Sequence, residues 1–158
     1  MAEILHKELS DKVIGAAFKV HNILGPGLLE SAYEGALVIE LKRRGLAVER
    51  QVVYPLIYEG EMAGAYIADI VVEDAVVLEL KSVKVLTAVM EAQLLNYLRL
   101  SAVPVGYLIN FRNPRLEFQR RVLTRRVASS AVASEHPDCG LRPPDRRPGG
   151  PAGPASGP

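Results

Sequence analysis

The hydrophobic pattern of this chain changes its period once, near Val48, and this change restricts the fold more than any other feature. Before Val48, apolar residues recur at helical spacing, which predicts one helix over residues 10–24 and a second over residues 28–45. Gly25-Pro26-Gly27 separates the two, and Ser10 suits the N-cap of the first. The chain therefore begins with two helices.

After Val48, the alternation of apolar and polar residues is typical of strands. Three strands follow one another closely with turn residues between them, which indicates an antiparallel meander. The expected elements are a strand over residues 48–58 that Pro55 breaks, strands over 65–72 and 75–83, a helix over 87–100 with Thr87 as its N-cap, a buried strand over 105–111 and a weaker edge strand over 116–122. This order predicts an α/β domain.

Composition limits the class of protein. A length of 158 residues fits about one domain, and 49% hydrophobic residues can form a core. Pro, Gly, Ser and Arg dominate the C-terminal part, so we expect one domain over residues 1–127 and a disordered tail over 128–158. The only cysteine, Cys139, excludes an intrachain disulfide and a cysteine-based zinc site. No apolar stretch approaches the roughly 18 to 20 residues of a membrane span, and the N-terminus does not resemble a signal peptide, so we expect a cytoplasmic protein without membrane contact.

Charge is unevenly distributed along the chain, although the net charge is only +1. Residues 1–110 carry ten Lys and Arg against fourteen Asp and Glu, whereas residues 111–158 carry nine Arg against four acidic residues. The arginines of the second segment either help to hold phosphates or form a solvated tail, and the sequence favours neither interpretation.

Two expected strands carry carboxylates and a lysine. Asp69 lies in the second strand, and Glu79-Leu80-Lys81 lies in the third. Because strand side chains alternate, Glu79 and Lys81 share a face. Asp69 can oppose Glu79 only if the connection around Asp74 has an odd number of residues, or if a bulge corrects the register. Two such carboxylates suit a hard cation such as Mg²⁺, which predicts phosphodiester chemistry.

The heptapeptide Gly27-Leu28-Leu29-Glu30-Ser31-Ala32-Tyr33 has the spacing GxxExxY. Further segments accompany it in order, namely Val20-His21, Glu49-Arg50-Gln51, Ala68-Asp69-Ile70-Val71-Val72-Glu73, Glu79-Leu80-Lys81, Glu91-Ala92-Gln93-Leu94-Leu95-Asn96-Tyr97-Leu98 and Leu108-Ile109-Asn110-Phe111. This ordered set, over residues 9–111, resembles the GxxExxY proteins, a bacterial and archaeal group assigned to the PD-(D/E)XK nuclease superfamily.

The resemblance implies a PD-(D/E)XK core, in which N-terminal helices, a β-meander, a helix and a strand form a mixed central sheet flanked by helices. It implies that Asp69, Glu79 and Glu30 ligate Mg²⁺ or Mn²⁺. Lys81 would steady the attacking water or the charge that develops on the phosphate.

Gln93 and Tyr97 lie one helical turn apart on the helix after Lys81, so both can face the same cleft. In related nucleases the matching Gln orients substrate or water. Small nucleases of this kind often pair to cut two strands, so a homodimer is a further expectation.

Ordinary structural roles also explain each of these residues. In that interpretation, Glu79 and Lys81 form a surface ion pair, and Glu30 only interacts favourably with the N-terminal end of its helix dipole. The Tyr97 ring belongs to the core with its hydroxyl at the rim, Gln93 is structural, and His21 is a packing residue.

Two functional hypotheses result. The first is a metal-dependent nuclease that hydrolyses phosphodiester bonds in DNA, using the carboxylates, Lys81, Gln93 and Tyr97. The alternative is a nucleic-acid or protein binding module that keeps the nuclease fold without turnover.

Overall fold

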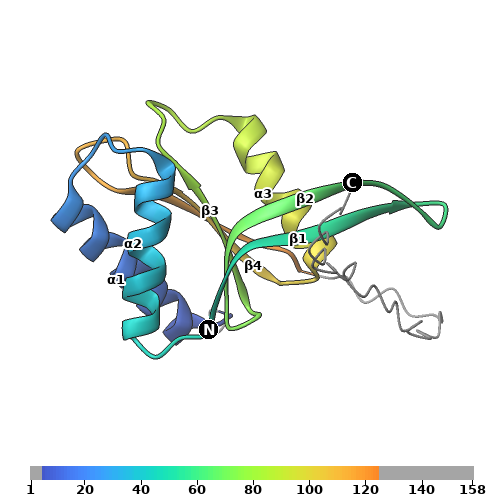
Figure 1. Ribbon diagram of the computed structural model, residues 1–158, viewed down its shortest axis with the longest axis horizontal. Helices are drawn as coiled ribbons and strands as arrows, with labels where there is room; N and C mark the ends of the chain where they lie inside the picture. The colour runs from blue at the N-terminus through green and yellow to red at the C-terminus, as the bar shows by residue number, and fades with distance from the viewer. Residues whose placement is uncertain (1–4, 125–158) are drawn as a thin grey trace, which may run out of the picture. The chain divides into compact units, whose positions relative to one another are not determined.

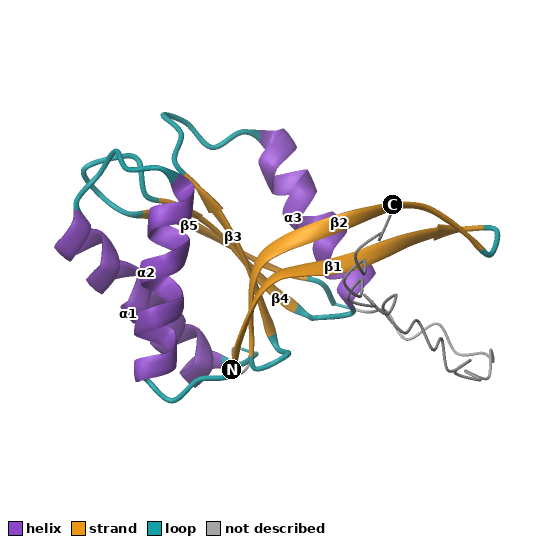
Figure 2. Ribbon diagram, in the orientation of Figure 1, coloured by secondary structure: helices purple, strands orange, loops and turns teal. Residues whose placement is uncertain are grey.

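A five-stranded sheet lies between helices on both of its faces in residues 5–124, the part of the chain that the structure describes (Figures 1 and 2). The structure is a computed structural model. In chain order the elements are α1 (Lys7–Leu24), α2 (Glu30–Arg43), β1 (Val48–Tyr58), β2 (Glu61–Val72), β3 (Val76–Lys81), α3 (Ala88–Ser101), β4 (Val105–Asn110) and β5 (Glu117–Val122). The predicted α/β fold with a mixed sheet and flanking helices is confirmed.

Strand order in the sheet follows the chain, β1-β2-β3-β4-β5. β1, β2 and β3 pair antiparallel, as the predicted meander requires. β4 pairs parallel with β3 after the α3 crossover, and β5 pairs antiparallel with β4. Because of the parallel pairing, the C-terminal ends of β3 and β4 lie side by side, with Lys81 next to Asn110.

The first half of the core lies between the sheet and the helices α1 and α2. It contains Val13, Ala17 and Val20 of α1, Tyr33, Leu37 and Leu41 of α2, and Ile70, Leu78, Leu80, Tyr107 and Ile109 of the sheet. The helical residues recur at the three- and four-residue spacing of one helix face, which is why this pattern could be recognised in the sequence.

The second half of the core lies under α3. It contains Leu94, Tyr97 and Leu98 of α3 together with Ala68, Val71, Val77 and Leu108 of the sheet. Gly106 on β4 permits this close approach, because a Cβ atom there would lie 2.7 Å from Leu94 Cδ1. α3 therefore packs tightly over the strands that carry the candidate site.

Helix α1 begins earlier than predicted. Its first residue is Lys7, and Ser10 is buried inside the helix with no hydrogen-bond partner for its hydroxyl among residues 5–124, so the N-cap prediction at Ser10 is wrong. Lys and Glu are good helix formers, and an ion pair between Lys7 and Asp11 supports the extra turn. The N-cap prediction at Thr87 is confirmed, because Thr87 Oγ1 accepts a hydrogen bond from the Met90 N–H at 3.4 Å.

The β1–β2 hairpin is longer than its pattern predicts. β2 begins at Glu61 rather than near residue 65, and β1 continues through Pro55, which pairs with Ala65. Proline is tolerated because β1 is an edge strand of the sheet. β3 pairs only with the last part of β2, so the rest of the hairpin extends past the sheet as a two-stranded ribbon (Figure 1).

Two further expectations concern a membrane-spanning helix and the C-terminal segment. No helix within residues 5–124 is both long and apolar enough to cross a membrane. The disordered tail expected over residues 128–158 lies outside the described residues.

Candidate active site

The turn between β2 and β3 sets the register on which the site depends. Three residues, Glu73, Asp74 and Ala75, connect Val72 to its paired residue Val76. Glu73 and Asp74 both adopt positive φ angles, of 53° and 49°. The connection therefore has an odd number of residues, the condition under which Asp69 and Glu79 can approach one another.

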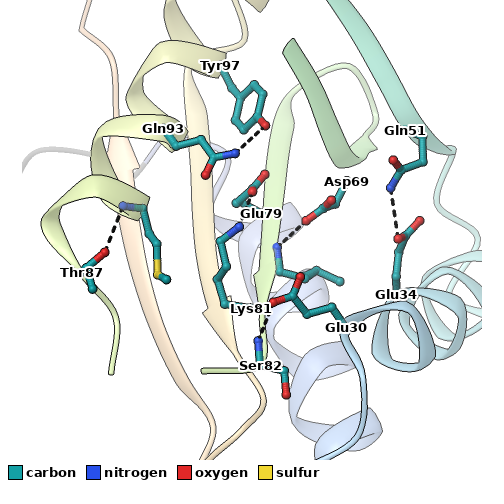
Figure 3. A network of polar contacts seen from close by, with 12 residues as sticks. Glu30, Glu34, Gln51, Asp69, Glu79, Lys81, Ser82, Thr87, Gln93 and Tyr97 are labelled. Atoms are coloured by element: carbon teal, nitrogen blue, oxygen red, sulfur yellow. Dashed lines mark hydrogen bonds and ion pairs between the residues drawn. The ribbon is translucent and has the colours of Figure 1, made fainter. Parts of the chain in front are cut away.

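Asp69 lies where β2 separates from β3. Regular pairing of the two strands ends at Ile70 and Leu78. One residue further on, Asp69 Oδ2 accepts a hydrogen bond from the Leu80 N–H at 2.7 Å (Figure 3). The carboxylate thus takes the place of a backbone carbonyl, which keeps it beside Glu79 while the rest of β2 diverges.

Glu79 and Lys81 form a buried ion pair on β3. Lys81 Nζ donates a hydrogen bond of 2.7 Å to Glu79 Oε1, and Glu79 is only 2% exposed. The shared face predicted for these two residues is confirmed, but the exposed surface pair considered as its alternative is wrong. Glu79 Oε2 is buried without a hydrogen-bond partner in residues 5–124, which is costly for an ionised carboxylate.

Burial raises the pKa of Glu79 to about 7, and the charge of Asp69 adds to this effect while Lys81 opposes it. Burial also raises the pKa of Asp69, against the hydrogen bond from Leu80 and the charge of Lys81. Burial works to lower the pKa of Lys81, but the hydrogen bond to Glu79 and the nearby carboxylates outweigh burial and raise it. The cluster therefore holds an excess of negative charge, which favours a proton or a cation.

Gln93 and Tyr97 lie on one face of α3, as predicted. Gln93 Nε2 donates a hydrogen bond of 2.9 Å to the Tyr97 hydroxyl, and both are drawn on the Glu79 side of β3 (Figure 3). The Tyr97 ring is 3% exposed and packs edge-on against Tyr66 at 5.9 Å. Burial raises the pKa of Tyr97, and the charges of Glu79 and Asp69 add to it while the hydrogen bond from Gln93 opposes it. The ring is part of the core, and the hydroxyl lies close enough to Glu79 and Asp69 for their charges to affect its pKa.

Glu30 is the first residue of α2 and is exposed. Its Oε1 accepts a hydrogen bond of 3.0 Å from the Ser82 N–H, at the end of β3 (Figure 3). No three His, Cys, Asp or Glu side chains among residues 5–124 are grouped closely enough to hold a metal. Glu30 is therefore near the site but not joined to Asp69 and Glu79, and its role as a metal ligand stays a prediction.

Gly27 and Tyr33, the other two residues of the spacing motif, shape the loop before Glu30. Gly27 has a φ of +90°, which side-chain-bearing residues rarely adopt. The Tyr33 hydroxyl donates a hydrogen bond of 2.6 Å to the Gly25 carbonyl and accepts one of 3.0 Å from the Leu28 N–H. Its buried ring stacks on Phe111 at 4.5 Å. The motif thus fixes a loop to the core and presents its glutamate to β3.

A pocket of about 540 Å³ lies beside this loop. Its lining includes Glu30 and Glu34 of α2, Asp69 of β2, Leu80 and Ser82 at the end of β3, and Arg112. Glu34 and Arg112 were not predicted as site residues. The spacing of Glu34, four residues after Glu30, is a signal that could have identified it.

Glu34 is held by two consecutive residues of β1. Arg50 Nε donates a hydrogen bond of 2.8 Å to Glu34 Oε1, and Gln51 Nε2 donates one of 3.1 Å to Oε2. Consecutive strand residues normally point to opposite faces. Gln51 has a φ of +49°, and this left-handed conformation lets both side chains reach the same carboxylate.

Arg112 lies on a loop that is fixed on both sides. The buried Asn110 side chain accepts hydrogen bonds from the N–H groups of Val83 and Arg112, at 3.1 and 3.2 Å. On the other side, His21 Nε2 lies 2.9 Å from the Asn113 carbonyl, and His21 is 5% exposed, so its packing role is confirmed. Arg112 itself forms no ion pair with any residue in 5–124.

The fold and this set of residues are those of an α/β protein of the nuclease class. The sequence profile of the PD-(D/E)XK nuclease superfamily matches residues 7–122, from the start of α1 to the end of β5. The chain belongs to that superfamily.

A solved structure titled "Crystal structure of SSO0001" is similar to this chain at 21% sequence identity and a TM-score of 0.45. The alignment covers 74% of this chain and 58% of that one, so the chain spans less than two thirds of its length. No curated protein matches the chain significantly.

Divalent metal ions are generally used by PD-(D/E)XK nucleases, and the residues present suit one. The donors at the strand divergence are carboxylate oxygens, which hard cations prefer. One of these oxygens, Glu79 Oε2, is buried and lacks a partner in the described residues. A cation would compensate that oxygen and the excess negative charge together.

Proposed function

We propose that this chain is a metal-dependent nuclease of the GxxExxY group that hydrolyses phosphodiester bonds in DNA. The observation that carries the proposal is the buried carboxylate of Glu79, which has an unpartnered oxygen beside Asp69 and a buried lysine, Lys81. Burying two carboxylates close together is costly in free energy, and a bound cation would offset that cost.

Asp69 and Glu79 would hold Mg²⁺ or Mn²⁺, with Glu30 as the third carboxylate. When bound, such an ion lowers the pKa of a coordinated water and polarises the phosphoryl oxygen. The Lys81 ammonium, already raised in pKa and held by Glu79, stays protonated and can stabilise negative charge that develops on the phosphate. Gln93 and the Tyr97 hydroxyl can orient the substrate or the attacking water through hydrogen bonds.

The position of Arg112 is an argument for an anionic substrate. Arg112 lines the same pocket as Asp69 and Glu30, it is not used in an ion pair within residues 5–124, and its backbone N–H is bonded to the Asn110 side chain. A guanidinium in this state can bind a phosphate through two parallel hydrogen bonds. We therefore assign to Arg112 a contact with a phosphate of the substrate.

A cleavage assay with Mg²⁺ and Mn²⁺ on single- and double-stranded DNA and RNA tests the proposal. Wild type and Asp11→Ala, which changes an exposed acid on α1, should cleave DNA, whereas Asp69→Ala and Lys81→Ala should lose at least about a hundredfold in rate. Cleavage by wild type no faster than by the two site variants would refute it.

A binding module without turnover is the second candidate. The observation that favours it is the hydrogen bond from the Ser82 N–H to Glu30. With Glu30 held there, only the carboxylates of Asp69 and Glu79 lie close to one another, and no group of three in residues 5–124 could hold a metal. Thermal melting separates the two candidates. At a metal concentration a hundred times Kd, the nuclease should gain about 2.7 kcal/mol, and Asp69→Ala should gain nothing. Equal shifts in both proteins, with DNA binding retained, would favour the binding module.

A further inference from the structure

One face of the β1–β2 ribbon is apolar and uncovered by any other element of residues 5–124. The register of the hairpin pairs Val53 with Ile67, Pro55 with Ala65 and Ile57 with Met62. Opposed residues of an antiparallel pair share a face. A register shift between Leu56 and Ile57 brings Met62 opposite Ile57, so these six side chains form one surface, here called the ribbon face. None of them is charged.

The opposite side of the same ribbon is the side that α3 covers. Val52, Tyr54 and Tyr66, which alternate with the residues of the ribbon face, pack against the core under α3. The ribbon face therefore points away from α3. Its large side chains are exposed by 56% at Val53, 55% at Ile57, 71% at Met62 and 48% at Ile67.

Exposed aliphatic side chains are common singly, but three consecutive cross-strand pairs without a charge are not. A two-stranded ribbon is also marginally stable unless its faces are packed, and only one face here is packed. The ribbon face thus has the properties of a surface that another molecule covers.

We propose that the ribbon face is the interface of a homodimer, in which two copies pack their ribbons face to face about a two-fold axis. Nucleic acid does not fit this surface, because the surface offers no cation, and Glu59 in the turn and Glu61 at the start of β2 repel phosphate. A second copy does fit it, because two identical uncharged faces meet without electrostatic cost, and twisted sheets pack face to face with nearly aligned strands.

The available area sets the strength expected of this contact. At the measured exposures, each face presents on the order of 500 Å², so a pair buries roughly 1,000 Å², at the lower limit of specific interfaces. An interface of this size is expected to be a weak one, so the dimer should dissociate on dilution. This inference does not depend on nuclease activity.

Sedimentation equilibrium of the full chain, from about 1 to about 100 µM, tests the proposal. Wild type should shift from monomer to dimer over this range. Ile57→Lys and Val53→Lys, each at an exposed position, should weaken the dimer at least tenfold while the circular dichroism spectrum stays unchanged. Ile39→Lys, on α2 and similarly exposed at 54%, should dimerise like wild type.

Three results would overturn the interface. They are a wild type that stays monomeric at the highest concentration, a dimer that is equally strong in both ribbon variants, and a dimer that Ile39→Lys weakens as much as the ribbon variants do. If one of the two ribbon variants fails to fold, the dimerisation of the other variant decides whether the ribbon face is the interface.

Discussion

Replacing Glu79 by Gln should stabilise the metal-free protein at neutral pH, although the side chain is buried in the candidate active site. Glu79 is 2% exposed and has one unpartnered oxygen. Gln keeps the shape of the side chain and can still accept a hydrogen bond from Lys81, but it removes the charge that burial disfavours. The gain in the free energy of unfolding should be greatest at pH values where Glu79 of the wild type is ionised.

The magnitude follows from the pKa. Burial raises the pKa of Glu79 from 4.5 to about 7, so the folded state retains a proton that the unfolded state releases above pH 4.5. A raised carboxylate pKa means that the free energy of unfolding falls as the pH rises from 4.5 to 7. At 1.36 kcal/mol for each pKa unit, the wild type loses about 3 kcal/mol over this interval, and Glu79→Gln does not.

Urea unfolding in EDTA, followed by circular dichroism between about pH 4.5 and 7.5, measures this difference. The two proteins should be similar at the acidic end and differ by about 3 kcal/mol at the neutral end, with the variant more stable. Glu61→Gln, which changes an exposed carboxylate of β2, should follow wild type. Parallel curves for Glu79→Gln and wild type would refute the reasoning, because they would mean that Glu79 ionises in the folded state as easily as in the unfolded chain.

Three further substitutions test other parts of the structure. Tyr33→Phe should destabilise the protein by about 1–3 kcal/mol in chemical denaturation, because the loop amide and carbonyl that its hydroxyl joins lose their partner; an unchanged midpoint would contradict this. Gly106→Ala should cost about 1–3 kcal/mol and lower Tm, since the added methyl group meets the Leu94 and Leu98 side chains of α3, and an unaltered Tm would mean that these side chains can move aside. Arg112→Ala should weaken DNA binding and reduce its salt dependence by about one phosphate contact, whereas Arg115→Ala, on the same loop but not lining the pocket, should not; equal effects would remove Arg112 from the substrate site.

The elements of this fold were predictable because their residues follow simple periods. Tyr33, Leu37 and Leu41 recur on one helix face, and β1 to β3 alternate between turns. The N-cap at Ser10 was predicted wrongly, since a good capping residue does not prevent helix formation by the residues before it. Pro55 was over-weighted as a break, because its effect depends on whether its strand lies at an edge.

The candidate site was predictable only where it follows from alternation along one strand. Glu79 and Lys81 share a face for that reason. The contact of Glu30 with Ser82 joins residues 52 positions apart, and no local pattern encodes it. The contacts of Glu34 depend on the left-handed conformation of Gln51, a residue type that gives no such signal. The orphaned oxygen of Glu79 is a property of three-dimensional packing alone.

The double hydrogen bond of the Tyr33 hydroxyl has a consequence for the dynamics of the site. Leu28 lies in an exposed loop, yet its amide hydrogen is donated to a side chain whose ring is fully buried against Phe111. That hydrogen exchanges with solvent only when this hydrogen bond opens, so its exchange should be slower than that of loop amides without a hydrogen-bond partner. The segment that leads into Glu30 is thus on the surface by position but is tied to the core through one side chain.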